Sequence, residues 1–194
     1  MKLTPKGQAT KQRIVEGAAA HLRSTDPLGV TLDDIRATTG TSKGQLFHYF
    51  PDGKEELFLE VARFEADRVL ADQQPYLGRL DSWTAWDQWC KAVVARYREQ
   101  GRECPLAALM AQVGSTPGAS EVSTTLLRHW QGHVERGILA MQAQGQVSER
   151  VDARRMAGAF ITGIQGGVST LRVTGRTEHL ESMLEILVEH LRTA

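Results

Sequence analysis

The fold of this chain is decided by the stretch from Thr31 to Phe50, which reads TLDDIRATTGTSKGQLFHYF. Its pattern predicts two short helices, at 32–38 and 43–49, joined by a turn at Gly40, where a residue able to adopt positive φ is needed. The second helix should end at Phe50, because the following proline disfavours helical geometry there. Inward packing that fixes the angle between the two helices is expected of Leu32, Ile35, Leu46 and Phe50.

The remaining side chains around the second helix are unusual for a protein surface. They offer hydroxyl, ammonium, amide, imidazole and aromatic groups, from Thr41, Ser42, Lys43, Gln45, Phe47, His48 and Tyr49. Such groups suit contacts to phosphates and base edges in a DNA major groove. Gly44 lacks a side chain at a point where the helix backbone would need to approach DNA closely.

Helical periodicity continues through the chain, and no stretch alternates apolar and polar residues as a half-buried strand would. One helix is predicted before the stretch, at 10–23, and six after it, at 52–74, 81–100, 104–113, 119–144, 152–173 and 177–192. The prediction is therefore an all-α protein of about nine helices. A three-helix DNA-binding head would occupy residues 1–52, and a helical-bundle body for ligand binding and dimerisation would occupy residues 53–194.

Composition sets the broad class of the protein. The chain has 194 residues and no run of about 18 apolar residues, which predicts that it does not span a membrane. The N-terminus lacks the apolar stretch of a secretory signal, and two cysteines are too few for a disulfide framework, so a cytoplasmic protein is expected. Residues 1–50 carry seven Lys and Arg against four Asp and Glu, while the rest carries sixteen against nineteen. A mildly basic head on a mildly acidic body is consistent with nucleic-acid binding by the head.

The segments 10–19, 42–50 and 54–57, with the helix start at Thr31, resemble the TetR family of repressors. The resemblance is specific over about residues 8–65. It implies that phosphates are contacted by Thr31, Lys43, His48, Tyr49 and Lys54. It also implies that Thr41, Gln45 and Phe47 lie nearest the bases. Gln45 departs from the family, which more often has Thr or Ser there, and a longer amide can bridge N6 and N7 of adenine.

Each of these residues also has a purely structural interpretation. The pairs Ser42 with Gln45 and Thr31 with Asp34 fit helix-capping boxes, and one group can both cap a helix and face DNA. For Gln45, base contact and capping both remain open. Phe47 and Tyr49 could belong to the core, although a seven-residue helix cannot bury every face.

The last two predicted helices suggest a dimer. A leucine stripe at helical spacing is formed by Leu180, Leu184, Leu187 and Leu191. Glycines at 158, 163, 166 and 167 suggest close backbone approach to a partner helix or a ligand. The resemblance implies that these two helices pair with their symmetry mates, and a two-fold DNA site needs two recognition helices about 34 Å apart. The alternative is an ordinary intramolecular core.

A ligand pocket in the body is suggested by aromatic and polar residues on several helices. The predicted lining consists of Trp83, Trp86, Cys90, Met110, Trp130, Phe160 and Gln165. An apolar pocket with a few polar groups is the usual form of a small-molecule site. The alternative is that these residues are packed core.

Other chemistry has little support in the sequence. His129 and His133 are four apart on a helix but lack further ligands nearby, so no metal is expected. Cys90 and Cys104 could form a redox switch, or could be small buried hydrophobic residues. No catalytic motif or phosphate loop occurs, and neither an enzyme nor a cofactor is predicted.

The resulting hypothesis is a ligand-responsive repressor that binds a palindromic operator as a homodimer and is released by a small hydrophobic or aromatic effector. Two competitors remain open. One is a regulator of this fold controlled by a protein partner, and the other is an enzyme built on the helical body.

Overall fold

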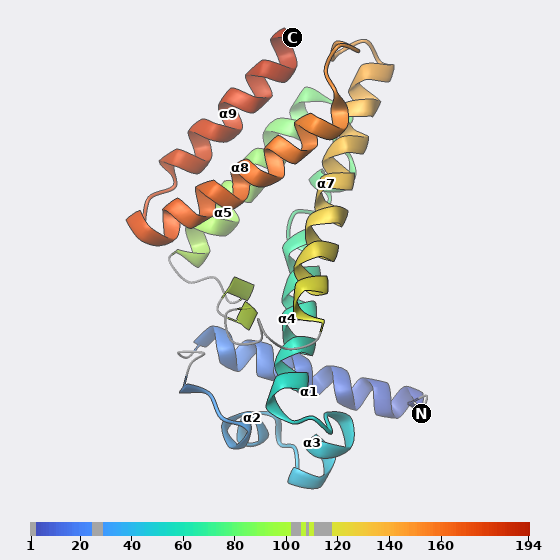
Figure 1. The fold of residues 1–194 in the computed structure, drawn as a ribbon, viewed down its shortest axis with the longest axis vertical. Helices are drawn as coiled ribbons and strands as arrows, with labels where there is room; N and C mark the ends of the chain where they lie inside the picture. Colours follow the sequence, from blue (N-terminus) through green and yellow to red (C-terminus); the bar gives the residue numbers. More distant parts are fainter. Residues whose placement is uncertain (1–2, 25–28, 102–105, 108, 111–117) are drawn as a thin grey trace. The chain divides into compact units, whose positions relative to one another are not determined.

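The computed structural model is built from helices throughout the part that it describes, which is residues 3–24, 29–101, 106–107, 109–110 and 118–194. Within these residues no strand occurs, and the predicted all-α fold is confirmed (Figure 1). The helices are α1 (Pro5–Ser24), α2 (Leu32–Thr39), α3 (Lys43–Tyr49), α4 (Lys54–Ala71), α5 (Trp83–Gln100), α7 (Ala119–Ala143), α8 (Ala153–Thr174) and α9 (Glu178–Thr193), with a short 3-10 helix, η2 (Tyr76–Gly78).

Two helix boundaries differ from the predictions for local reasons. Helix α1 begins at Pro5 rather than near Thr10, because Thr4 Oγ1 accepts a hydrogen bond from the Gly7 N–H and proline suits the first helical position. Helix α4 begins at Lys54, after a turn in which Gly53 adopts φ of +74°. The helix predicted at 104–113 lies largely outside the described residues, as does Cys104.

The chain forms two compact units. The first comprises Met1–Arg68 and Cys104–Ser123, and the second Val69–Glu103 and Thr124–Ala194. Helix α4 is continuous across the boundary between Arg68 and Val69. The first unit extends past the predicted domain boundary at residue 52, because Lys54 Nζ donates to the Val30 carbonyl and Arg23 pairs with Glu65.

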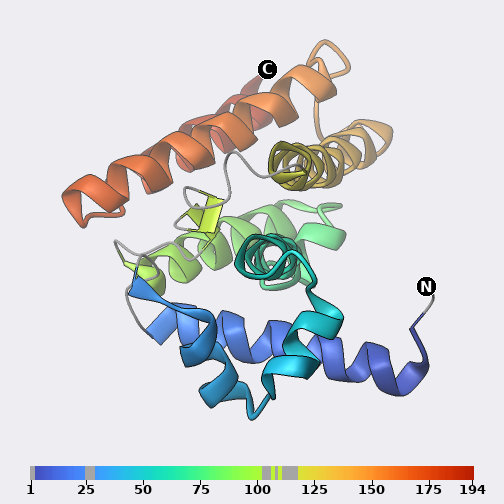
Figure 2. The same ribbon diagram turned by 60° about the horizontal axis from the view of Figure 1, so that its bottom comes forward.

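The first unit is held together where α1, α2 and α3 meet (Figure 2). Its centre is fully buried and apolar, with Ile14, Ala18, Ile35, Leu46 and Phe50 all at 0% exposure. Helix α1 approaches α2 at Gly17, where an added Cβ would lie 2.6 Å from the Thr39 methyl group. The angle between the helices therefore depends on a missing side chain as well as on the buried residues.

The second unit is organised around aromatic rings. The ring centroid of Phe160 lies 5.3 Å from that of Trp86 and 5.8 Å from that of Trp89, and all three side chains are fully buried. Helices α8 and α9 pack so closely at Gly167 that an added Cβ there would lie 2.9 Å from the Leu180 Cα. No helix in the described residues is long and apolar enough to cross a bilayer.

Candidate nucleic-acid interface and effector site

Helix α2 begins and ends on local signals. Thr31 Oγ1 accepts from the Asp34 N–H at 3.2 Å, and the Asp34 carboxylate accepts from the Thr31 N–H at 2.9 Å. The Thr31 hydroxyl also donates to the Asp34 carboxylate at 2.6 Å, and this bond, together with the one from the Thr31 N–H, lowers the pKa of Asp34 below its usual value. At the other end Gly40 adopts φ of +58°, a conformation that glycine reaches without steric cost, and the turn between α2 and α3 follows.

Helix α3 is fixed by a second capping box and by two buried side chains. Ser42 Oγ accepts from the Gln45 N–H, and Gln45 Oε1 accepts from the Ser42 N–H, both at 3.2 Å. Leu46 and Phe50 are fully buried on the opposite side. The helix is therefore oriented by its inner face and its first turn, and on its outer face Gln45 takes part in the capping box.

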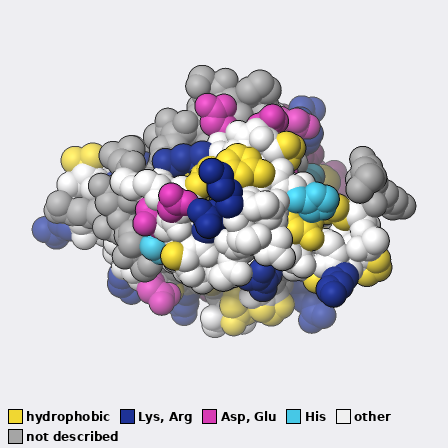
Figure 3. Space-filling view, turned by 90° about the horizontal axis from the view of Figure 1, so that it is seen from below, with side chains coloured by type: hydrophobic (Ala, Val, Ile, Leu, Met, Phe, Trp, Pro, Cys, Tyr) yellow, Lys and Arg dark blue, Asp and Glu magenta, His cyan; other side chains and the backbone are white. Residues whose placement is uncertain are grey.

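That outer face carries most of the predicted DNA-binding groups. Lys43, Gln45 and His48 are exposed, and Phe47 is 41% exposed although it is a large hydrophobic residue. Tyr49 is half-buried, and its ring lies edge-on to His48 at 4.9 Å between centroids. Seen from below, Lys and Arg side chains lie at several points, with acidic, histidine and hydrophobic groups among them (Figure 3).

Gly44 lies on the same outer face. A Cβ added there would meet no described atom within 4 Å. Packing of the chain itself therefore does not require glycine at this position, which is consistent with the predicted close approach to an outside molecule.

Two predicted DNA-binding residues have other contacts. Thr41 is only 4% exposed, and its Oγ1 accepts a hydrogen bond from Thr39 Oγ1 at 2.8 Å. The structure thus places the Thr41 side chain inside the turn, so the prediction that it lies nearest the bases is not supported. Lys54 Nζ donates to the Val30 carbonyl at 2.6 Å and lies 5.0 Å from the Phe58 ring centroid, so part of its donor capacity is used within the unit.

Basic residues of α1 that the sequence analysis did not single out support the turn. Arg13 donates to the Thr39 carbonyl at the end of α2. Lys11 Nζ lies 5.4 Å from the centroid of the Phe50 ring. Sequence reasoning missed both, because their roles depend on how α1 crosses α2 and α3 rather than on a local motif.

The predicted effector-binding residues fall into different environments. Trp86, Trp130 and Phe160 are fully buried, and Trp86 and Phe160 contact each other as packed core, which was the alternative interpretation. Gln165 is exposed on α8, and Met110 belongs to the first unit rather than the second. The residues predicted to line one pocket are therefore not shown to form one.

Trp83 and Cys90 lie toward α9. Arg192 lies over the Trp83 ring, 4.9 Å from its centroid. Burial raises the pKa of the Cys90 thiol to about 12, with Asp87 adding to the shift. A thiol with so high a pKa is a poor nucleophile at neutral pH, so the structure favours Cys90 as a hydrophobic residue rather than a redox switch.

His129 and His133 of α7 belong to no group of three or more potential metal ligands among the described residues. Burial lowers the pKa of His133, and the positive charges of Arg136 and His129 add to the effect.

The leucine stripe of α9 faces the protein's own interior. Leu180, Leu184 and Leu191 are at most 2% exposed, while Leu187 is half-buried. For the three buried residues the alternative of an intramolecular core holds, because α9 packs them against α8 and α5. Gly163 and Gly167 serve this packing too, since Cβ atoms there would overlap Met183 and Leu180.

Comparisons with known proteins agree with this architecture. Residues 14–61 match the model of bacterial regulatory proteins of the tetR family, and residues 83–187 match the tetracyclin repressor-like C-terminal domain. An uncharacterized HTH-type transcriptional regulator of Mycobacterium tuberculosis is 24% identical over 127 residues, which are 62% of this chain and 62% of that protein. The HTH-type transcriptional repressor AcnR of Corynebacterium efficiens is 40% identical over 60 residues, 31% of each chain.

Solved structures share the fold over almost the whole chain. A TetR transcriptional regulator from Chloroflexus aurantiacus superimposes with a TM-score of 0.76 at 24% identity, covering 98% of both chains. A TetR-family regulator from Cytophaga hutchinsonii gives 0.80 at 16% identity, covering both chains completely. With the C-terminal model alone covering more than half of the residues, the chain belongs to the TetR family of bacterial regulatory proteins.

Proposed function

We propose that the protein is a cytoplasmic transcriptional repressor that binds a palindromic operator as a homodimer and leaves it when a small hydrophobic or aromatic effector binds. The observation that carries the DNA-binding part is the exposed outer face of α3. A short helix that is capped at Ser42 and anchored by Leu46 and Phe50 presents Lys43, Gln45 and Phe47 to the outside. AcnR, similar to this chain over 60 residues, is called a repressor, which supports repression as the output.

Roles on the DNA follow from the chemistry of each exposed group. Ser42, Lys43, His48 and Tyr49 are proposed to contact phosphates through hydroxyl, ammonium, imidazole and phenol groups, whereas the Thr31 hydroxyl donates its proton to the Asp34 carboxylate. Gln45 and Phe47 are proposed to face base edges. Gln45 Oε1 accepts from the Ser42 N–H, but the amide NH2 has no partner within the described chain and can donate to a base acceptor.

The DNA-binding proposal is tested with fluorescently labelled fragments from upstream of the protein's own gene. Lys43→Ala is expected to weaken binding several-fold on all fragments, because a phosphate contact carries no sequence information. Gln45→Ala is expected to relax discrimination at one base position. Lys91→Ala removes another exposed lysine, from α5 in the other unit, and serves as the matched control. Equal affinity of Lys43→Ala and Lys91→Ala would exclude α3 as the DNA contact.

The proposed dimer face lies on the solvent side of α8 and α9, not on the leucine stripe. Five exposed residues at helical spacing on α8 have small side chains or none, which permits close helix approach: Ala159, Thr162, Gly166, Ser169 and Val173. Val173 is 78% exposed, and Ile186 on α9 is 64% exposed. Burial of such exposed apolar side chains against a partner would stabilise a dimer.

Dimerisation through this face is tested by sedimentation. Ile186→Glu is expected to shift the protein toward monomer, since a carboxylate would be buried without a partner. Leu139→Glu changes an apolar residue that is 50% exposed on α7 and should leave the dimer intact. If both variants stay dimeric at the same concentrations, the interface lies elsewhere.

The effector is proposed to bind the second unit near α7. Trp130 is fully buried, and its indole N–H has no hydrogen-bond partner among the described residues, whereas Trp86 and Trp89 each donate to an acceptor. An aromatic effector that carries an acceptor would satisfy this donor.

A thermal-shift screen tests the proposal, because a ligand of the native state raises the melting temperature by mass action. An effector must then also release DNA. A screen whose hits leave DNA binding unchanged would favour control by a protein partner instead.

A further inference from the structure

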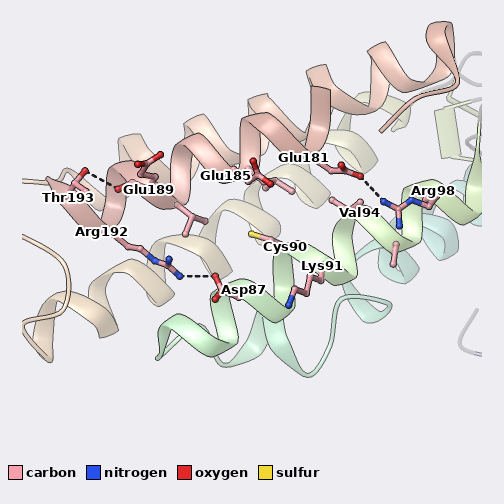
Figure 4. Close-up of a pocket in the computed structure, with 13 residues that line it drawn as sticks. Asp87, Cys90, Lys91, Val94, Arg98, Glu181, Glu185, Glu189, Arg192 and Thr193 are labelled. Carbon is pink, nitrogen blue, oxygen red and sulfur yellow. Dashed lines mark hydrogen bonds and ion pairs between the residues drawn. The ribbon is translucent and has the colours of Figure 1, made fainter. Parts of the chain in front are cut away.

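A groove between α5 and α9 lies entirely within the second unit and has no part in the proposed DNA, dimer or effector sites. Its volume is 910 Å³, within the range of about 300–1,000 Å³ that small-molecule sites occupy. Both of its walls are single helices, so its geometry is set by their packing (Figure 4).

Ion pairs close the two ends of this groove. Arg192 of α9 donates to Asp87 of α5 at 2.9 Å, and Arg98 of α5 donates to Glu181 of α9 at 2.7 Å. The two helices therefore run in opposite directions, and their charges are matched at each end (Figure 4).

The floor between these ends is apolar and uncharged. Val94, Leu184 and Val188 line it and are at most 9% exposed. Cys90 points its sulfur toward α9 in the middle of the groove (Figure 4). Because the pKa of this thiol is raised to about 12, it contributes no charge at neutral pH.

The middle of the groove carries unmatched negative charge. Glu185 and Glu189 lie one turn apart on α9, both exposed, and neither forms an ion pair with any described residue. On the opposite wall Lys91 is the one basic lining residue outside the two end pairs. Two carboxylates against one ammonium leave an excess of one negative charge above an apolar floor.

We propose that this groove binds a small amphipathic amine, whose ammonium group pairs with Glu185 and whose hydrocarbon part lies on Val94 and Leu184. The end pairs leave no free arginine for an anionic ligand, and the carboxylates disfavour one. A neutral hydrocarbon could pack on the apolar floor but could not form the ion pair with Glu185. The site is separate from the effector site proposed near Trp130, so either proposal can fail without the other.

Hexylammonium chloride is a suitable probe, with hexanol and hexanoate as matched neutral and anionic probes. Binding is followed on the methyl NMR signals of Val94, Leu184 and Val188 in the full-length protein. Hexylammonium is expected to shift these signals at concentrations at least about tenfold below those needed for hexanol, and hexanoate should not shift them. The methyl signal of Ile164, buried on α8 and outside the groove, is the reference and should stay in place.

Charge variants make the test specific to the groove. Glu185→Gln should weaken hexylammonium binding roughly three- to fivefold, the size expected of one partly exposed ion pair. Lys91→Ala should strengthen binding by a similar factor, because it removes a like charge. Glu149→Gln, an exposed residue outside the groove, should change nothing.

Three results would overturn the proposal. Equal responses to hexylammonium and hexanol would show that charge does not contribute to binding. Unchanged affinity in Glu185→Gln would show that Glu185 is not the partner of the ammonium group. Shifts of the groove signals with protein concentration alone would identify a second copy of the chain as the occupant.

Discussion

Helices α3 and α5 both carry aromatic side chains, but they use them in opposite ways. In the seven-residue α3, Phe47 is 41% exposed, whereas in the eighteen-residue α5, Trp86 and Trp89 are fully buried. The buried rings of α5 also have acceptors for their N–H groups, at Leu80 and Gln73. An aromatic residue is therefore available to a ligand where a short, locally capped helix cannot bury it, and is part of the core where a long helix packs on several neighbours.

Removal of a core ring should give the largest effect on stability. Phe160→Ala is expected to lower the free energy of unfolding by about 3–5 kcal/mol, because loss of a ring that packs against Trp86 and Trp89 leaves a cavity between them. Phe47→Ala in α3 should cost less than about 1 kcal/mol and weaken DNA binding instead. Urea denaturation at one fixed protein concentration measures the free energy of unfolding of both variants. Similar losses in the two variants would mean that Phe47 is a core residue.

Two glycines provide the next comparison. Gly167→Ala should destabilise the protein by about 1–3 kcal/mol, because the new Cβ would lie 2.9 Å from the Leu180 backbone. Gly44→Ala meets open space and should stabilise α3 by up to about 1 kcal/mol while weakening DNA binding. Thermal unfolding and a DNA titration separate the effects. Unimpaired DNA binding by Gly44→Ala would show that the α3 backbone does not approach DNA closely at that point.

Two fully buried tryptophans, Trp89 and Trp130, differ in the hydrogen bonding of their indole N–H groups. Trp89→Phe leaves the fully buried Gln73 without the indole donor that its Oε1 accepts at 2.8 Å, whereas Trp130→Phe breaks no bond within the described chain. Trp89→Phe should therefore cost about 1–3 kcal/mol more than Trp130→Phe. Paired denaturation curves test the difference. Equal losses would mean that Trp130 has an acceptor in solution.

Loss of a cap in the head should give the smallest change. Ser42→Ala removes the acceptor for the Gln45 N–H and should cost about 1 kcal/mol. Thr124→Ala, exposed on α7 and outside the proposed sites, is the control and should be neutral or slightly stabilising. Circular dichroism during thermal unfolding compares the two variants. A neutral Ser42→Ala would show that packing of Leu46 and Phe50 alone positions α3.

Local signals explain why the head could be predicted from the sequence. The capping pairs Thr31 with Asp34 and Ser42 with Gln45, and the turn at Gly40, act within four residues and are all found in the structure. The placement of Thr41 could not be predicted, because its burial depends on Thr39 and on how α1 crosses α2. The same holds for Gly17, whose space is taken by Thr39.

The body was harder to predict because its pattern allows several packings. The stripe of Leu180, Leu184 and Leu191 fits a dimer interface and an intramolecular core equally well, and only the position of α8 and α5 shows that it is core. The groove between α5 and α9 has no sequence motif at all. It arises from the antiparallel register that joins Asp87 to Arg192 and Arg98 to Glu181.

The central claim, that the outer face of α3 binds DNA, is tested most directly by a salt titration. Binding of the wild-type protein and of Lys43→Ala to an upstream DNA fragment is measured across a range of salt concentrations. The account predicts a steep fall in affinity with salt for the wild type, and a slope reduced by about two for Lys43→Ala, since each protomer of the proposed dimer loses one phosphate contact. A wild-type affinity that does not depend on salt, or an identical slope for Lys43→Ala, would contradict it.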